Sequence, residues 1–279
     1  MKQAQGGKGS FFKVLYKRFF DDEVLGLSAE LAYFFLLSLF PFLLFLVTLL
    51  GYLPISQAEM LGFIHQFAPG ETINIIEENL NQIMGKQNGK LLSFGIIATL
   101  WSASNGINAV VRAFNRAYDV RENRSFIVAR GMSILLTFAM LFVIIVALLL
   151  PVFGREIGLF VFSVFGLSGA FLSVWNALRW TVSSFILFIV FTCLYYFAPN
   201  KRLKIKEIVT GSSIATIGWI LVSLAFSYYV SNFGNYTATY GSLGGIIVLM
   251  IWFYLSGMIT ILGGEINAIL HRERINKNC

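Results

Sequence analysis

Charged residues are scarce in this chain of 279 residues. Aspartate, glutamate, lysine and arginine make up 13% of it, whereas soluble domains contain about 25%. Hydrophobic residue types account for 57%, and the mean hydropathy is +0.75. Such a chain has too little polar surface to cover a soluble sphere. The composition therefore excludes an ordinary soluble domain and predicts a protein that is solvated by lipid.

Cysteine and histidine are also scarce, with two of each. Cys193 lies in an apolar run and Cys279 is the last residue, which predicts neither a disulfide framework nor a metal site. His65 and His271 are expected on opposite sides of the membrane, where they cannot share a metal ion. The sequence lacks an HExxH motif, a GxSxG motif in a strand-to-helix setting and a P-loop. We therefore expect no catalytic residues, no cofactor, no metal and no enzyme activity.

Long uncharged runs are what the sequence has instead. The clearest extends from Gly241 to Gly264 and would form about 36 Å of helix, enough to cross a hydrocarbon core of roughly 30 Å. Its small residues recur at helical spacing, which lets another helix approach closely within lipid. We expect an all-α polytopic membrane protein, a single transmembrane domain over 1–279, with six transmembrane helices at about 30–53, 91–111, 131–151, 176–198, 208–230 and 241–266.

Two flanking regions are amphipathic. Residues 1–29 include the aromatic and basic stretch 11–20, which is typical of an interfacial helix on an anionic leaflet or of a simple topology signal. Residues 54–90 hold a capping box at Ser56 and Glu59, followed by two apolar stripes at helical spacing. We expect amphipathic surface helices there, forming a cap on the outer face.

The distribution of lysine and arginine predicts the topology. With six spans and the N-terminus in the cytoplasm, the positive-inside rule is obeyed, because cytoplasmic segments hold all 21 of these residues except Lys86, Lys90, Arg155 and Arg179. Both termini are therefore expected in the cytoplasm, with 267–279 as a cytoplasmic tail. The basic residues are spread over four segments without an aromatic stacking platform, so nucleic acid is not an expected partner.

The uncharged segment 157–178 is ambiguous. It is long enough for a seventh span, but a seventh span would place the later basic segments outside. We interpret it as an interfacial, re-entrant or outer-side piece that feeds the fourth span.

Polar residues within a membrane are costly and are functional candidates by default. Four of the candidates map near the cytoplasmic ends of spans one, two and six, and two asparagines lie about one turn deeper. One hypothesis is a substrate-binding cluster at the inner mouth of a cavity, with Arg112 pairing one carboxylate. The alternatives are residues that reach interfacial water, a structural ion pair, and interhelical hydrogen bonds for the two asparagines. The candidates are Glu30, Asn105, Asn108, Arg112, Glu265 and Asn267.

Three ordered stretches carry a resemblance to a known family. They are ELAYFFLLSLFP at 30–41, WSASNGINAVVRAFNRAYDVRENRSF at 101–126 and YGSLGGIIVLMIWFYLSGMITILGGEINA at 240–268. They resemble the YihY/BrkB family of bacterial inner-membrane proteins, formerly mislabelled ribonuclease BN, whose members have six predicted spans. The resemblance implies a multi-pass protein of the bacterial inner membrane. Family members have been linked to serum resistance, to ribonuclease activity and to export of lipids or small solutes. The family has no agreed catalytic motif, so the resemblance assigns no residue a role.

The expected function is transport, export or flipping of a lipid or a small amphiphilic or organic solute. Kinked and glycine-rich helices can alternate between conformations, and polar residues gather on a few of them. Membrane lipids are the expected partners, and oligomerisation is left open. The alternative is a non-transporting scaffold for an envelope assembly, and a membrane-embedded enzyme comes third. A cavity where polar residues of several spans converge would favour transport, and a solid core with an apolar outer patch would favour the scaffold.

Overall fold

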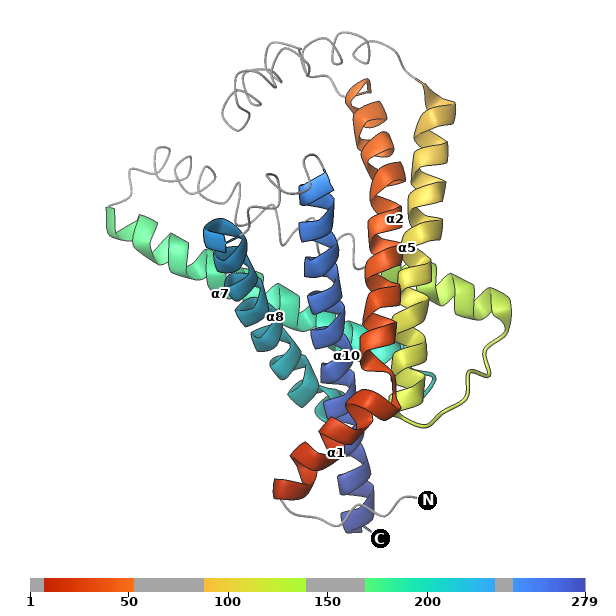
Figure 1. The fold of residues 1–279 in the computed structure, drawn as a ribbon, viewed down its shortest axis with the longest axis vertical. Helices are drawn as coiled ribbons and strands as arrows, with labels where there is room; N and C mark the ends of the chain where they lie inside the picture. Colours follow the sequence, from red (N-terminus) through yellow and green to blue (C-terminus); the bar gives the residue numbers. More distant parts are fainter. Residues whose placement is uncertain (1–7, 53–87, 139–168, 234–242, 279) are drawn as a thin grey trace. The chain divides into compact units, whose positions relative to one another are not determined.

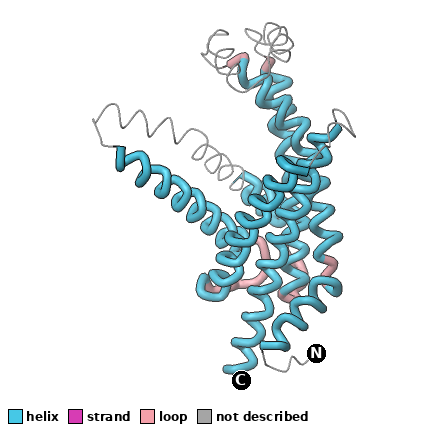
Figure 2. Tube along the Cα trace, turned by 60° about the vertical axis from the view of Figure 1, so that its left-hand side comes forward, coloured by secondary structure: helices cyan, strands magenta, loops and turns pink. Residues whose placement is uncertain are grey.

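Helices make up nearly all of the chain that the structure describes. The computed structural model describes residues 8–52, 88–138, 169–233 and 243–278. Within these ranges short loops join the helices and no strand occurs, as Figure 2 shows. The all-α prediction is confirmed for this part of the chain. The helices, most of them labelled in Figure 1, are α1 (Lys8–Asp21), α2 (Val24–Leu50), α5 (Gly89–Ala117), the helix Phe126–Phe138, α7 (Gly169–Phe197), α8 (Ile205–Phe233) and α10 (Gly244–Asn278).

Five of the described helices contain segments long and apolar enough to cross a membrane. They correspond to the first, second, fourth, fifth and sixth expected spans and comprise Val24–Leu49, Gly89–Ala117, Trp180–Phe197, Ile205–Asn232 and Gly244–Asn276. The third expected span, 131–151, begins within the helix Phe126–Phe138 and continues outside the described residues. The expected cap at 54–90 also lies outside them, apart from residues 88–90, where α5 begins. The count of six spans and the location of the termini stay predictions.

Several helices extend beyond the apolar runs that predicted them. α2 begins at Val24 instead of 30, and α10 continues through the expected tail to Asn278. α7 begins at Gly169, so residues 169–178 of the ambiguous segment form one helix with the fourth span, while 157–168 lie outside the described residues. Uncharged runs mark only the part of a helix that lies in hydrocarbon. Long polar side chains at its ends reach water while the backbone continues its helical hydrogen bonds.

The surfaces of the long helices suit a lipid environment. Large apolar side chains are exposed on them, including Phe40 at 76%, Ile97 at 65% and Leu221 at 60%. Buried hydroxyl groups instead donate to a backbone carbonyl one turn earlier in their own helix, which satisfies them without water. Examples are Ser28, Thr48, Thr99, Thr137, Ser212, Thr216 and Thr260.

The chain forms two compact units. Unit 1 consists of Met1–Phe34 and Ser104–Cys279, and unit 2 of Phe35–Ala103. Within unit 2, α2 and α5 approach so closely that a Cβ atom on Gly95 would lie 2.9 Å from the Cβ atom of Phe45. Only glycine fits at this crossing, as expected for helices whose association in lipid depends on close backbone packing.

Within unit 1, α10 is the helix on which the others converge. It packs against α8 and α1, and α8 packs against α7. Figure 1 shows α1 crossing α10 near the C-terminal end of α10. The space that a side chain on Gly263 would need is occupied by the phenol of Tyr195, and the space beside Gly264 by the ring of Phe114. Gly211 of α8 contacts the Gly263 carbonyl. Gly263 and Gly264 therefore let α5, α7 and α8 pack closely against α10.

Candidate functional site

The most buried charge in the described chain lies where α1, α5 and α10 meet. Glu265 of α10 is fully buried, and its Oε2 atom accepts a hydrogen bond of 2.9 Å from Nη1 of Arg18 in α1. Both terminal nitrogens of Arg18 also donate to the carbonyl of Ala117, each at 3.1 Å, at the C-terminal end of α5. A cation is favourable there because the last carbonyls of a helix carry partial negative charge. One arginine thus joins three helices.

This ion pair is expensive to bury. Removing two charges from water costs several kcal/mol per ion, which good geometry offsets only in part. The Oε1 atom of Glu265 has no hydrogen-bond partner among the described residues, and an unsatisfied buried acceptor costs about 1–3 kcal/mol. A hydrophobic pair of similar volume would avoid both costs. The pair is therefore a functional candidate.

The second candidate carboxylate, Glu30, forms an ion pair with Arg112 of α5. Both side chains are partly exposed, at 37% for Glu30 and 52% for Arg112. One turn further along α5, Arg116 lies 3.1 Å from Glu23 and 3.8 Å from Asp22, in the turn between α1 and α2. Exposed pairs of this kind contribute about 0–1 kcal/mol each, so they orient the α1–α2 turn and add little stability.

The two acids in the α1–α2 turn have opposite pKa shifts. Burial raises the pKa of Asp22 above its ordinary value, although Arg18 and Arg116 act in the other direction. The hydrogen bond and the charge of Arg116 lower the pKa of Glu23, which is exposed. The exposed fractions of the side chains, 18% for Asp22 and 67% for Glu23, show that the turn has one side against the protein and one side in solvent.

The two candidate asparagines bind a neighbouring helix. Asn105 Oδ1 accepts a hydrogen bond of 2.7 Å from Nη1 of Arg130, and Asn108 Oδ1 accepts one from the hydroxyl of Ser133. Both partners, Arg130 and Ser133, belong to the helix Phe126–Phe138. Interhelical hydrogen bonds of this kind average about 0.6 kcal/mol in membrane proteins, which is the structural alternative for these residues.

Asn267 belongs to the contact between α8 and α10. Its side chain is fully buried, and its Oδ1 atom accepts a hydrogen bond of 2.7 Å from the backbone nitrogen of Gly211. Its Nδ2 atom has no hydrogen-bond partner among the described residues. Asn267 therefore stabilises the contact between the two helices.

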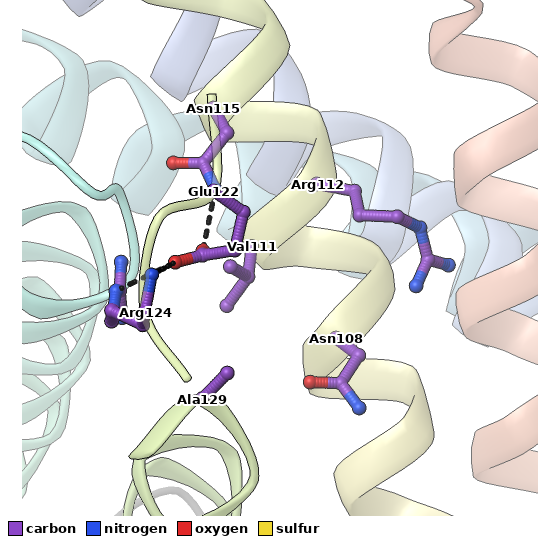
Figure 3. Close-up of a pocket in the computed structure, with 7 residues that line it drawn as sticks. All are labelled: Asn108, Val111, Arg112, Asn115, Glu122, Arg124 and Ala129. Atoms are coloured by element: carbon purple, nitrogen blue, oxygen red, sulfur yellow. Dashed lines mark hydrogen bonds and ion pairs between the residues drawn. The ribbon is translucent and has the colours of Figure 1, made fainter. Parts of the chain in front are cut away.

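Two of the candidates line the same pocket, which has a volume of about 110 Å³. In Figure 3, Asn115, Glu122 and Arg124 are joined by hydrogen bonds on one side of it, and the guanidinium of Arg112 points away from them. The volume can hold a few water molecules but is below the roughly 300–1,000 Å³ of an organic ligand pocket. The lining residues are Asn108, Val111, Arg112, Asn115, Glu122, Arg124 and Ala129.

The structure thus places the six predicted residues at several contacts of unit 1. Glu30 and Arg112 contact each other, and Asn108 and Arg112 share a pocket. Glu265 and Asn267 bind different partners on different helices. Sequence reasoning missed Arg18 as the partner of Glu265. Among the described residues, no group of three or more His, Cys, Asp or Glu side chains is arranged to hold a metal ion.

Comparison with known proteins gives consistent matches over nearly the whole chain. The family model described as Virulence factor BrkB matches residues 15–278. The Putative ribonuclease-like protein YfkH of Bacillus subtilis (strain 168) is 60% identical over 265 residues, which cover 95% of this chain and 96% of that protein. The UPF0761 membrane protein VP0125 of Vibrio parahaemolyticus is 31% identical over 271 residues, covering 95% and 83%. No solved structure matches.

Proposed function

Since this chain belongs to the BrkB family of membrane proteins, as its resemblance predicted, we propose that it transports, exports or flips a lipid or a small amphiphilic or organic solute across the bacterial inner membrane. In this proposal six helices cross the bilayer and both termini lie in the cytoplasm. The positive-inside distribution of lysine and arginine supports that orientation.

The buried contact between Arg18 and Glu265 carries the proposal. α1 lies outside the five segments able to cross a membrane, whereas Glu265 lies within the last of them. The pair therefore connects a surface helix to the interior of a spanning helix bundle. Buried charges within a spanning segment, even near its inner end, are retained where they line a pathway or hold a contact that must open and close. We assign the pair the second role.

In the proposed cycle, α1 closes the inner end of unit 1. With the pair formed, Glu265 is fully buried and Arg18 covers the end of α5. Release of Arg18 would open Glu265 to water, where hydration replaces the lost ion pair. This compensation makes two states of similar free energy attainable, as alternating access requires.

The test is transport by purified full-length protein in vesicles that contain labelled lipids or trapped amphiphilic solutes. The variants are Arg18→Glu, Glu265→Arg and their combination, which reverses the pair. We expect each single change to lower transport at least about tenfold, because like charges then meet in a buried site. The double variant should recover part of it. The matched control reverses the exposed pair of Arg116 and Glu23 at the same end, and it should transport as the wild type does.

The results separate the proposal from its alternative. Absence of transport by the wild type for every member of the panel would refute the transporter and favour the scaffold. Transport by the wild type with unchanged single variants would retain transport but exclude this ion pair as the closing contact. Equal losses in the control and in the Arg18–Glu265 variants would show a general charge effect.

A further inference from the structure

A second and larger cavity, widely open to the surface, lies at the C-terminal end of α7, outside the site described above. Its volume is about 420 Å³, within the roughly 300–1,000 Å³ of pockets that hold organic ligands. It lies within unit 1, and Arg124 is the one lining residue that it shares with the small pocket of Figure 3. The residues that matter to its chemistry are Arg124, Met132, Tyr196, Phe197, Lys201 and Arg202.

One part of the cavity wall is apolar and aromatic. Tyr196 and Phe197 end the apolar segment Trp180–Phe197, and both are exposed, at 40% and 48%. Aromatic residues at the end of a spanning helix lie at the level of the lipid headgroups. The cavity therefore opens at the boundary between hydrocarbon and water.

The other part of the wall is cationic. Arg124 is fixed in place, since its Nη2 atom donates to the carbonyl of Ala198 at 2.9 Å and its Nε atom lies 3.1 Å from Glu122. Lys201 and Arg202 lie in the loop between α7 and α8 and contribute two further cations, and none of the described residues that line the cavity is a carboxylate. Because Glu122 partly neutralises Arg124, the positive charge that attracts an anion comes mainly from Lys201 and Arg202.

The charge of Lys201 lies in partly buried surroundings, beside the ring of Tyr118, which does not line the cavity. Its Nζ atom lies 5.4 Å from the centre of the Tyr118 ring. Burial lowers the pKa of Lys201, and the positive charge of Arg272 lowers it further. The negative charges of Glu207 and Asp119 act in the opposite direction but are smaller effects. An anion bound in the cavity would offset both the desolvation and the repulsion.

We propose that this cavity binds the phosphate-bearing headgroup of an anionic phospholipid. The phosphodiester contacts Lys201, Arg202 and Arg124, and the start of the acyl chains lies against Met132, Tyr196 and Phe197. Lysine and arginine are the usual partners of phosphate. The apolar wall at headgroup depth favours a lipid over free phosphate, which would leave that wall unused. The site does not depend on the transport proposal, because it requires only binding.

Lipid binding to the full-length protein in neutral detergent tests the site, measured by native mass spectrometry. The probes are phosphatidylglycerol, phosphatidylcholine, glycerol phosphate and inorganic phosphate. The test variant combines Lys201→Gln with Arg202→Gln. The matched control combines Lys204→Gln with Lys206→Gln, which removes two exposed cations outside the cavity, one from the same loop and one from the first turn of α8. Arg124 stays unchanged because it also joins two loops.

We expect the wild type to bind phosphatidylglycerol at least tenfold more tightly than phosphatidylcholine. Each cation near an anionic lipid contributes about fivefold in affinity, so the test variant should bind about 25-fold more weakly and the control should change less than threefold. Phe197→Ala should weaken binding of phosphatidylglycerol and leave glycerol phosphate unchanged.

Three results would overturn the proposal. Equal losses in the test and control variants would mean that net charge, and not the cavity, attracts the lipid. Equal binding of the two lipids would exclude recognition of an anionic headgroup. Inorganic phosphate that competes as strongly as phosphatidylglycerol would identify a free-phosphate site. Size-exclusion profiles matching the wild type identify variants that remain folded, and the Phe197→Ala comparison still tests the lipid assignment if the double variant does not fold.

Discussion

The buried ion pair makes a quantitative prediction about stability in which the two partners are unequal. Arg18→Ala removes three hydrogen bonds and leaves the carboxylate of Glu265 fully buried. Removing one partner of a buried pair costs about 3–5 kcal/mol. Glu265→Gln keeps the side-chain shape, and Arg18 keeps both bonds to the carbonyl of Ala117. It should cost about 1–2 kcal/mol, the difference between a charged and a neutral hydrogen bond.

An exposed pair at the same end serves as the reference. Glu30→Gln breaks the pair with Arg112, in which both side chains are partly exposed. Solvent screening limits such pairs to about 0–1 kcal/mol. The expected order of destabilisation is therefore Arg18→Ala, then Glu265→Gln, then Glu30→Gln.

Reversible unfolding of the full-length protein in mixed micelles of neutral detergent and dodecyl sulfate measures these free energies. Circular dichroism at 222 nm follows the helices, since they dominate the described structure, and size exclusion checks that each variant starts folded. The reasoning fails if Arg18→Ala costs no more than Glu30→Gln, because α1 would then not be held by the buried pair. It also fails if Glu265→Gln costs more than Arg18→Ala.

Three further predictions concern packing, hydrogen bonding and pH. Gly211→Ala places a Cβ against the backbone of α10 and should lower stability by about 1–3 kcal/mol. Gly245→Ala, which has no neighbour within 4 Å among the described residues, should be neutral or stabilise by up to about 1 kcal/mol. Thermal melting in detergent distinguishes the two variants. Tyr195→Phe removes the buried hydrogen bond of 2.8 Å to the carbonyl of Thr260. Its loss should lower the stability by about 0.5–1.5 kcal/mol in the same melts. A Tyr195→Phe melt identical to that of the wild type would contradict this. Asp22→Asn should stabilise at neutral pH, because burial raises the pKa of Asp22 and penalises its charged form. That gain should disappear as the pH falls towards the ordinary value of 3.8, and a gain that persists in acid would contradict it.

The spanning helices were predictable because length and apolarity alone decide them. A run such as Gly241 to Gly264 has no other way to satisfy its backbone in lipid than as a helix, and α10 contains it from Gly244. The ends were less predictable. Residues 267–278 continue α10 with charged side chains, and no hydropathy threshold distinguishes such a helical extension from a tail.

Contacts between distant residues could not be predicted from a single sequence. Arg18 lies 247 positions before Glu265, and several arginines were equally suitable partners. The helical wheel of α1 held part of the signal, since Arg18 lies about 200° from Tyr16. The exposed row of Phe12, Tyr16 and Phe20 is therefore on the opposite side. The sequence alone could not show which of these faces packs against the protein.

Replacing the buried pair by apolar residues separates its structural role from its functional one. Apolar residues of similar volume in place of a buried ion pair are often neutral or stabilising by about 1–4 kcal/mol. Arg18→Met combined with Glu265→Leu should therefore unfold no more easily than the wild type in mixed micelles, because α1 can pack against α10 through apolar contacts. Transport in vesicles should fall at least about tenfold in the same variant, because a closed state held by apolar contacts gains no hydration on opening. Loss of stability together with transport would mean that the pair is structural. Full stability with normal transport would mean that the inner end does not open at this contact.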